Sequence, residues 1–340
     1  MEKGVLFGLD IGGTLVKICF NETSDATIDP RLLEFLTESE EYGRTGHRDK
    51  HLSIAVSPAQ RLHFIVFETS RIVNAIELIR EHNLTSTLGS AICATGGGAH
   101  KYERDIKRAQ GLGLNVNIKD EIGCLVRGLD FLLRNDPNQV YSLQGGEKAV
   151  KASPETLWPF LVVNVGTGVS IIRANSSTDF QRVSGSGIGG GTYWGLARLL
   201  TKVESFQASL DLTEHGSLDA TSVTVGDIYG QNSYLGLDSD MIAAFLARSA
   251  PRVENGPGPS DADILKGLLM MVTNNIAQIA YINAQKEGVD TIFFAGNFFR
   301  RNDIAMKALD EGIRFWSGGA KNALFLRHEG YFGAVGSLLS

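Results

Sequence analysis

The sequence predicts an α/β fold built from two related lobes, each a mixed sheet flanked by helices. Residues 5–20 form an apolar run, a glycine turn and a second apolar run, which is the pattern of a β-hairpin. Residues 160–173 repeat this pattern, with Asn164 where Asp10 stands in the first copy. An internal repeat of this kind indicates two duplicated lobes that face each other across a ligand.

The composition is that of an ordinary globular protein. Of the 340 residues, 43% are hydrophobic and 21% are charged, and the chain is long enough for two domains. The net charge of −6 argues against a nucleic-acid surface, although a local basic pocket remains compatible with it. No apolar run approaches the length of a membrane span, no leader segment is evident, and the three cysteines lack paired spacing. We therefore expect a cytoplasmic protein with reduced thiols that binds neither nucleic acid nor membrane.

The turn of the first hairpin has the chemistry of a phosphate site. Gly12 and Gly13 have no Cβ, so backbone N–H groups can come close to an anion. Thr14 adds a hydroxyl, Lys17 a positive charge, and Asp10 a carboxylate at the mouth of the turn. These groups suit a nucleotide phosphate, and Asp10 suits its Mg²⁺, directly or through water. A plain glycine turn with a solvated aspartate is the alternative, and the spacing does not fit a P-loop.

The first lobe is expected to cover residues 1–157. Residues 22–60 are polar and aperiodic, which predicts a partly disordered excursion with one short helix near residues 32–36. A glycine triplet at 96–98 leads into a helix, and a polar loop at 134–157 ends the lobe. The remaining strands are expected at 61–67, 91–95 and 114–118, with Ile72, Ile76 and Ile79 on one face of a helix after the first.

Glu121 is the candidate catalytic acid or base of this lobe. Asp120 can cap a helix that begins at Glu121 and has its apolar residues on one stripe. Glu121 would then lie at the carboxyl end of a strand, where α/β sheets gather active-site groups. Glutamate is also common in a first helical turn because it complements the helix dipole. Spacing alone leaves both roles open.

The second lobe, residues 158–340, contains the most glycine-dense stretch of the chain. Residues 184–192 lead directly into a helix at 193–200, and such a loop suits a phosphate or another anion, with a flexible linker as the alternative. A turn is expected at 227–230. A long helix at 261–286 is expected to carry Ile264, Leu268, Met271, Asn275 and Ile279 on one face. Further elements are strands at 291–295 and 323–326, a helix toward Trp316, and a last helix after residue 328.

Several motifs connect the chain to a known group of proteins. The segments DIGGTLVK (10–17), NVGTG (164–168) and GNFFR (296–300) together resemble the sugar kinase, heat-shock and actin ATPase superfamily. A closer resemblance is to the eukaryotic-type (type II) pantothenate kinases, whose motifs occur here in the family's order, except that residues 22–60 have no counterpart. The closer motifs are ATGGGA (94–99), VGTGVSI (165–171), IGGGT (188–192), GDIYG (226–230), TNNI (273–276) and HEGYFGA (328–334).

This resemblance implies a fold, a reaction and a set of site residues. The fold would be the two-lobed, ribonuclease H-like fold of actin-like ATPases. The reaction would be ATP-dependent phosphorylation of pantothenate, the committed step toward coenzyme A, in a homodimer inhibited by acyl-CoA, with acetyl-CoA and CoA as the expected inhibitors. Glu121 falls on the catalytic-base position, and Thr167, Ser170 and Arg182 fall on positions that bind pantothenate and the overlapping part of acetyl-CoA. The expected ATP phosphate-binding residues are Asp10, Gly12, Gly13, Thr14, Lys17, Gly189, Gly190, Gly191 and Thr192.

Some positions depart from the family's pattern. Thr167 stands where the family usually has serine, Gly187 lacks a hydroxyl present in relatives, and Gly312 replaces an alanine beside the acyl-CoA pocket. These changes bear on inhibition and not on the fold.

Two other functions remain as alternatives. A related small-molecule kinase would need an aspartate base in an Asn-Asp pair, and an inactive CoA-binding regulator would be expected to have lost Glu121 or Arg182.

Overall fold

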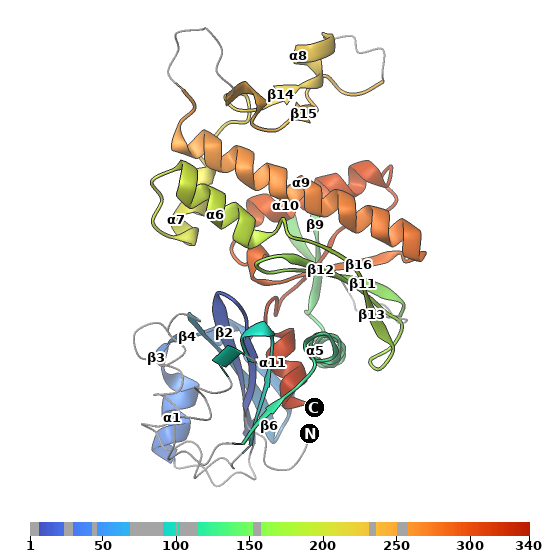
Figure 1. The fold of residues 1–340 in the computed structure, drawn as a ribbon. Coiled ribbons are helices and arrows are strands. Elements are labelled where there is room, and N and C mark those ends of the chain that lie inside the picture. Colours follow the sequence, from blue (N-terminus) through green and yellow to red (C-terminus); the bar gives the residue numbers. More distant parts are fainter. Residues whose placement is uncertain are drawn as a thin grey trace.

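The computed structural model of the protein describes most of the chain and arranges it in two lobes (Figure 1). The first lobe holds one mixed sheet, and the second lobe holds another, together with a small outlying unit above the long helix α9 (Asp261–Glu287). The described residues are 7–23, 30–42, 46–68, 91–99, 101–102, 115–151, 158–230, 236–249 and 258–340.

Within the described residues, the first sheet has eight strands. Their order is β3-β4-β6-β2-β1-β7-β8. Strand β5 pairs with the first residues of β6, and β4 pairs with residues nearer its end. The strands are β1 (Phe7–Ile11), β2 (Leu15–Thr23), β3 (Glu41–Tyr42), β4 (Gly46–Arg48), β5 (Ile54–Ser57), β6 (Gln60–Glu68), β7 (Ala91–Thr95) and β8 (Asn115–Ile118).

The second sheet has seven strands among the residues that the structure describes. Their order is β10-β9-β17-β16-β11-β12-β13. The strands are β9 (Val140–Gln144), β10 (Glu147–Lys151), β11 (Phe160–Val165), β12 (Val169–Ala174), β13 (Phe180–Ser186), β16 (Thr291–Ala295) and β17 (Leu324–Leu326).

The two sheets share one internal plan. In the first sheet, β6, β2 and β1 are antiparallel neighbours, and β7 and β8 continue from β1 in parallel. In the second, β13, β12 and β11 are antiparallel, and β16 and β17 continue from β11 in parallel. Asp10 pairs with Thr95, and its counterpart Asn164 pairs with Ala295 at the same place in the plan. The predicted duplicated two-lobed fold is thereby confirmed.

Helices α5 (Glu121–Asn135) and α11 (Phe332–Leu338) cover one face of the first sheet and pack on each other. Their backbones are in direct contact, because a Cβ on Gly128 would overlap Phe332 O and one on Gly336 would overlap Cys124 O. Helix α11 is the last of the chain, yet Figure 1 shows it among the strands of the first lobe. The chain therefore crosses between the lobes after α5 and crosses back after β17.

The change of sheet comes before the lobe boundary expected at 157/158. Residues 134–157 were expected to be a polar loop, but β9 and β10 form a hairpin at the edge of the second sheet. Gly145 and Gly146, with φ of 60° and 87°, make the two-residue turn between them. Glycine pairs suit such turns because both central residues need positive φ. The Gly-Gly pair between two alternating runs is the signal that the expectation of a loop overlooked.

The described part of residues 22–60 has more regular structure than its composition suggests. Helix α1 (Pro30–Glu38) confirms the expected short helix. The expectation of disorder is wrong for residues 46–60, where β4 and β5 pair with β6 and a 3₁₀ turn, η1 (Lys50–Leu52), lies between them. Both strands are short, β4 lies between β3 and β6, and exposed polar residues such as His47 hide the alternation that marks a strand. The helix expected to contain Ile72, Ile76 and Ile79 lies outside the described residues.

Helix α9 confirms the expected long helix. Ser260 caps its first turn, and Gly288 ends it in a left-handed conformation. Of the five residues expected on one face, Leu268 is fully buried, and Ile264, Met271 and Ile279 are partly buried against the same core. The helix is apolar over much of its surface, so the sequence period does not single out one stripe. The buried stripe is Leu265, Leu268, Leu269, Val272, Ile276 and Ala280.

The other helices whose bounds the structure describes lie in the second lobe. A capping box between Thr224 and Asp227 begins a short helix where a turn was expected. The elements are α6 (Gly190–Leu200), α7 (Phe206–Thr213), α8 (Val225–Tyr229), η3 (Ala247–Ser249), η4 (Asn297–Phe299) and α10 (Asp303–Trp316), with strands β14 (Val223–Thr224) and β15 (Ile242–Ala244) in the outlying unit.

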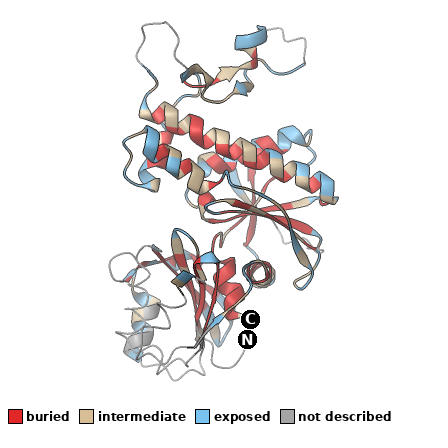
Figure 2. Ribbon diagram, viewed as in Figure 1, coloured by how far each residue is buried: buried red, intermediate tan, exposed pale blue. Residues whose placement is uncertain are grey.

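The buried residues gather in the two sheets and on the helix faces that cover them (Figure 2). All three cysteines, Cys19, Cys93 and Cys124, are buried and unbridged, as their spacing predicts. In the part of the chain that the structure describes, no helix has the length and apolarity that a membrane crossing requires.

Candidate active site

Asp10 and Lys17 form the centre of the first predicted site. They are direct partners across the β1–β2 hairpin, so their side chains lie on the same face of the sheet. Two glycines make room for the Asp10 carboxylate. A Cβ on Gly96 would lie 2.6 Å from Oδ1, and one on Gly333 would lie 2.6 Å from Oδ2. The carboxylate is therefore seated between the loop after β7 and the first turn of α11.

Burial and neighbouring charges shift the titration of both residues. Burial raises the pKa of Asp10 to about 6; the Lys17 ammonium opposes this rise and the Glu121 carboxylate adds to it. Burial lowers the pKa of Lys17, while Asp10, Glu329 and Glu121 act in the opposite direction. Two residues that the sequence assigns to phosphate and metal binding thus interact with the assigned catalytic glutamate.

The two glycine turns meet at this point. A Cβ on Gly13, in the first turn, would lie 3.4 Å from Thr167 Oγ1, in the second turn. Each turn is closed by its own backbone bond: Gly12 N donates to Leu15 O at 2.9 Å, and Gly166 N donates to Gly168 O at 2.9 Å. The duplicated hairpins of the two lobes therefore face each other, as the internal repeat predicts.

The glycine-rich loop before α6 packs against the second turn. Gly190 N donates to Gly166 O at 3.0 Å, and Gly191 N donates to Thr167 O at 2.9 Å. A Cβ on Gly189 would lie 2.7 Å from the carbonyl carbon of Gly168. The amides of Gly190 and Gly191 therefore already have backbone acceptors. Close backbone packing is the physical reason for the glycines here.

Thr192 closes the same loop. Its hydroxyl donates to Gly187 O at 2.8 Å and lies 3.3 Å from Gly189 N, which donates to it. The position that lacks a side chain at Gly187 has open space around it, with no atom within 4 Å of a built Cβ. The loop therefore presents a compact backbone surface beside the second turn.

Ser170 and Arg182 lie together on β12 and β13. Arg182 Nε donates to Ser170 Oγ at 3.3 Å. Gly185 faces Ser170 across the strand pair, and a Cβ there would overlap the Arg182 guanidinium. Arg182 is exposed, as is Thr167 in the turn at the start of β12. The three residues that the resemblance assigns to the substrate thus occupy one hairpin and its neighbouring strand.

Glu121 is the first residue of α5 and is exposed. The cap predicted for this helix is present, with the Asp120 carboxylate accepting from Gly123 N at 2.6 Å. The start of α5 lies against β13, because a Cβ on Gly123 would be 3.1 Å from Phe180 Cζ. The helix that positions Glu121 therefore packs on the strand that holds Arg182.

The cluster also contains residues that the sequence analysis did not assign to the site. A Cβ on Gly330, whose φ is +91°, would lie 3.0 Å from Lys17 Nζ, so the loop between β17 and α11 covers the ammonium. Burial raises the pKa of Glu329 to about 8, and the positive charges of Arg300 and Lys148 oppose that rise. The GNFFR and HEGYFGA motifs contain Arg300 and Glu329 and could have pointed to them.

The donor set suits a magnesium ion held mainly by a nucleotide. No group of three or more His, Cys, Asp or Glu side chains in the described residues could enclose a metal. Magnesium typically takes one or two carboxylates and completes its shell with phosphate oxygens and water. Asp10, seated between two glycines beside the first turn, provides such a carboxylate.

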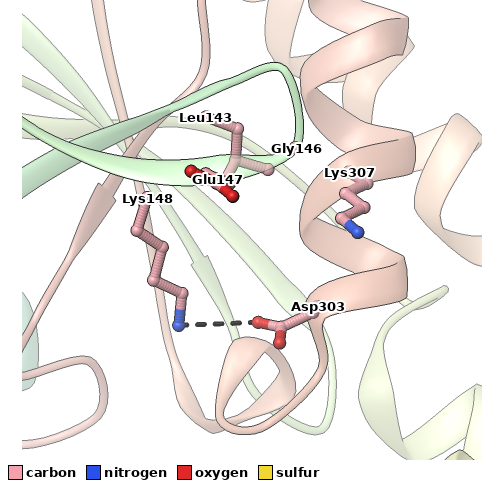
Figure 3. Close-up of a pocket in the computed structure, with 6 residues that line it drawn as sticks. All are labelled: Leu143, Gly146, Glu147, Lys148, Asp303 and Lys307. Carbon is pink, nitrogen blue, oxygen red and sulfur yellow. Dashed lines mark ion pairs between the residues drawn. The ribbon is translucent and has the colours of Figure 1, made fainter.

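A separate hollow of about 280 Å³ lies between the β9–β10 hairpin and the start of α10 (Figure 3). Lys148 and Asp303 form an ion pair of 3.5 Å on its side, and Lys307 projects from α10 toward Gly146. None of the predicted site residues lines it. Its lining residues are Leu143, Gly146, Glu147, Lys148, Asp303 and Lys307.

Solved structures resemble this chain at low identity. A glucokinase from Balamuthia mandrillaris in complex with glucose aligns with a TM-score of 0.44 and 13% identity, covering 98% of this chain and 92% of that one. The archaeal actin homologue Ta0583 aligns with a TM-score of 0.41 and 12% identity, covering 98% of each chain.

Sequence relatives cover almost the whole chain. Pantothenate kinase 2 of Arabidopsis thaliana is 38% identical over 348 residues, 98% of this chain and 38% of that protein. Pantothenate kinase 1 of the same plant is 36% identical over 346 residues, 98% of this chain and 84% of that protein. The 4'-phosphopantetheine phosphatase of Mus musculus is 35% identical over 343 residues, 100% of this chain and 41% of that protein. The chain thus spans about two fifths of the length of two of these relatives. A family model described as Fumble matches residues 6–340, and the chain therefore belongs to the Fumble family.

Proposed function

We propose that this chain is an ATP-dependent pantothenate kinase. It transfers the γ-phosphate of ATP to the primary hydroxyl of pantothenate, giving 4'-phosphopantothenate, the first committed step of coenzyme A biosynthesis. The main support is the meeting of the two glycine turns beside the interacting side chains of Asp10, Lys17 and Glu121. Relatives named pantothenate kinase, 36–38% identical over nearly the whole chain, support the choice of substrate.

The nucleotide would bind between the turns. Gly13 and Thr14 present backbone and hydroxyl donors to the phosphates, and Lys17 offsets their charge. Gly12, whose N–H already donates to Leu15 O, holds the shape of the turn and lets the phosphates come close to its backbone. The loop of residues 189–192 forms the opposite wall by shape, because all four of its amides already donate within the protein. Magnesium bound to the phosphates would neutralise part of their charge, with Asp10 as its protein ligand, directly or through water.

Pantothenate would bind along β12 and β13. Arg182 can pair with its carboxylate, and the hydroxyls of Thr167 and Ser170 can bond its amide and hydroxyl groups. Glu121 accepts the proton of the attacking hydroxyl as the phosphoryl group is transferred, which requires good positioning more than a strong base. The pantetheine part of acetyl-CoA would occupy the same positions, which gives feedback inhibition, and the chain acts as a homodimer.

The direct test is ATP-dependent phosphorylation of pantothenate by the purified protein and by Glu121→Gln. Wild type should form 4'-phosphopantothenate, with a rate that falls when acetyl-CoA is added, and Glu121→Gln should lose at least two orders of magnitude in kcat. Asp303→Asn is the matched control, because Asp303 is also an exposed first residue of a helix but lies at the separate hollow. A wild type that binds ATP and CoA without phosphorylating pantothenate would refute the proposal in favour of a CoA-binding regulator.

A further inference from the structure

The turn formed by η1 and its N-cap Asp49 is a buried contact between the two lobes. Asp49 is 3% exposed. Its carboxylate accepts from the guanidinium of Arg300, which follows η4 in the second lobe, and from the phenol of Tyr331, the N-cap of α11. The Asp49 N–H donates to Phe64 O of β6 at 2.9 Å. Asp49 therefore links the first sheet to the second lobe and to the return crossing.

The loop of residues 328–331 is attached to that turn at both ends. At one end, the fully buried His328 places Nε2 2.7 Å from Leu52 O. At the other end, Tyr331 donates to Asp49. The Tyr331 ring also packs on Phe64, with ring centroids 5.0 Å apart. A short loop held at both ends has little freedom to shift independently of the turn.

The middle of this loop lies on the ammonium of Lys17. The Gly330 backbone is close enough that a Cβ there would be 3.0 Å from Nζ. The positive charge of Arg300 and the negative charge of Glu329 both act on Lys17, in opposite directions. The position of the loop and of Arg300 therefore sets the packing and the electrostatic surroundings of the ammonium.

We propose that Asp49 is a positioning residue of the phosphate site, acting through Tyr331 and Arg300 on Lys17. It does not touch the nucleotide. Its carboxylate fixes the loop against the Lys17 side chain and offsets the charge of Arg300, which would otherwise repel the ammonium more strongly. The inference rests on the proposed kinase function, because it assumes that Lys17 contacts ATP phosphates. It also gives residues 46–52, which have no counterpart in the family motifs, a role in nucleotide binding.

A merely structural role of Asp49 makes a different prediction. Removing one member of a buried ion pair lowers stability wherever the pair lies. A positioning role additionally changes the affinity for ATP and leaves the affinity for pantothenate unchanged, because the substrate residues lie on β12 and β13 and not on this loop. Comparing the loss of stability with the loss of ATP affinity therefore distinguishes a structural role from a positioning role.

The experiment compares Asp49→Asn and the milder Tyr331→Phe with wild type in the full chain. The measurements are the Kd of a non-hydrolysable ATP analogue by calorimetry, KM for ATP and for pantothenate, and the melting temperature. Tyr331→Phe removes only the hydroxyl that reaches Asp49 and keeps the packed ring, so a foldable variant is at hand if Asp49→Asn is too unstable. We expect both variants to weaken ATP-analogue binding about tenfold, as for loss of a hydrogen bond to a charged group, with KM for pantothenate unchanged.

Two matched controls lie away from the loop. Asp310 is a buried aspartate that accepts from Arg314 at 2.9 Å and from Ala323 N at 3.1 Å, so Asp310→Asn removes an equivalent buried charge. Tyr193 is a buried tyrosine whose hydroxyl donates to Ser209 at 3.1 Å, which makes Tyr193→Phe the counterpart of Tyr331→Phe. The controls should lower the melting temperature and leave the nucleotide Kd unchanged.

The outcomes are distinct. If Asp49→Asn and Tyr331→Phe lower only the melting temperature, as the controls do, or if they weaken both substrates equally, the positioning role is refuted. A double-mutant cycle of Asp49→Asn and Arg300→Lys should show coupling in the nucleotide Kd, because Asp49 and Arg300 act as one unit. If the effects of the two substitutions on Kd simply add, the role of Arg300 in the proposal is refuted. If wild type binds the nucleotide but does not phosphorylate pantothenate, the proposed function fails, and the Kd comparison still decides the role of Asp49.

Discussion

Gly13 of the first hairpin turn lies beside Thr167 of the second, with 3.4 Å between the Thr167 hydroxyl oxygen and the position of a Cβ on Gly13. This distance is an ordinary van der Waals contact, and no other atom outside the adjoining residues lies within 4 Å of that Cβ position. The turns of two lobes that are separate in sequence therefore approach closely, yet the space around Gly13 is otherwise open. Packing in the folded chain therefore does not require glycine at this position, which leaves the proposed phosphate site as the reason for it.

We accordingly expect Gly13→Ala to preserve stability and impair nucleotide binding. The added methyl group fits the folded chain but occupies space next to the proposed phosphates. KM for ATP should rise several-fold while the melting temperature stays close to that of wild type. Gly195→Ala is the control, because a Cβ at this exposed position in α6 also meets no atom within 4 Å and alanine favours a helix. An unchanged KM for ATP in Gly13→Ala would contradict a phosphate at this turn.

Asp10 should show a conflict between stability and activity. Its folded-state pKa of about 6 lies above the ordinary value of 3.8, so it contributes stability below pH 3.8 that is lost as pH rises through about 6. At pH 7 to 8 the ionised, partly buried carboxylate is therefore a cost of roughly 1–3 kcal/mol. Asp10→Asn should melt at a higher temperature than wild type above pH 6 and lose phosphoryl transfer. The stability difference should shrink as pH falls toward 4, and its persistence at pH 4 would contradict this assignment.

His328 should produce the opposite pH dependence. Burial lowers its pKa to about 4 from the ordinary 6.5, so its contribution to stability is full above pH 6.5 and is lost as pH falls toward 4. The difference corresponds to roughly 2–3 kcal/mol over that range. Neutral His328 can donate from Nε2 to Leu52 O, 2.7 Å away, while its Nδ1 contacts the Gln139 side chain.

The check is the melting temperature of wild type and His328→Gln between pH 4 and 8. The variant cannot be protonated, so its stability relative to wild type should improve steadily as pH falls from 6.5. His215→Gln, at an exposed position, should follow the wild-type curve. Parallel curves for wild type and His328→Gln would show that His328 is not buried in its neutral form.

The sequence predicts the parts of the site that are local in the chain. Three features are each formed by residues close together in the sequence, so spacing alone locates them. They are the turn at 12–14, the pair of Asp10 and Lys17, and the cap before Glu121. The approach of Gly13 to Thr167 could also be anticipated, because the same hairpin occurs twice.

The contacts of Asp49 could not be predicted from spacing. Its partners Arg300 and Tyr331 are more than 250 residues away and meet it only because the last helix returns to the first lobe. The glycines at 189–191 show a second limit. A glycine-rich stretch before a helix fits either free amides for an anion or close backbone packing, and only the bonds to Gly166 and Thr167 distinguish the two.

Arg182 provides the test of the substrate side. Arg182→Lys keeps the charge but loses the planar guanidinium that donates to Ser170 and would pair with a carboxylate through two bonds. We expect KM for pantothenate to rise about tenfold or more, KM for ATP to stay unchanged, and inhibition by acetyl-CoA to weaken in parallel, since both ligands would use this residue.

The control for Arg182 is Arg173→Lys on β12, where the arginine donates to Glu287 at 3.2 Å and to Asn175 at 3.1 Å. This variant loses comparable surface hydrogen bonds. It should leave KM for pantothenate, KM for ATP and the inhibition by acetyl-CoA unchanged. Arg182 and the first hairpin turn belong to different lobes. A rise in KM for ATP equal to that for pantothenate would therefore mean that Arg182 supports the nucleotide site of the other lobe as well as the substrate site. A rise for pantothenate alone, with weaker inhibition by acetyl-CoA, would place both ligands on β12 and β13.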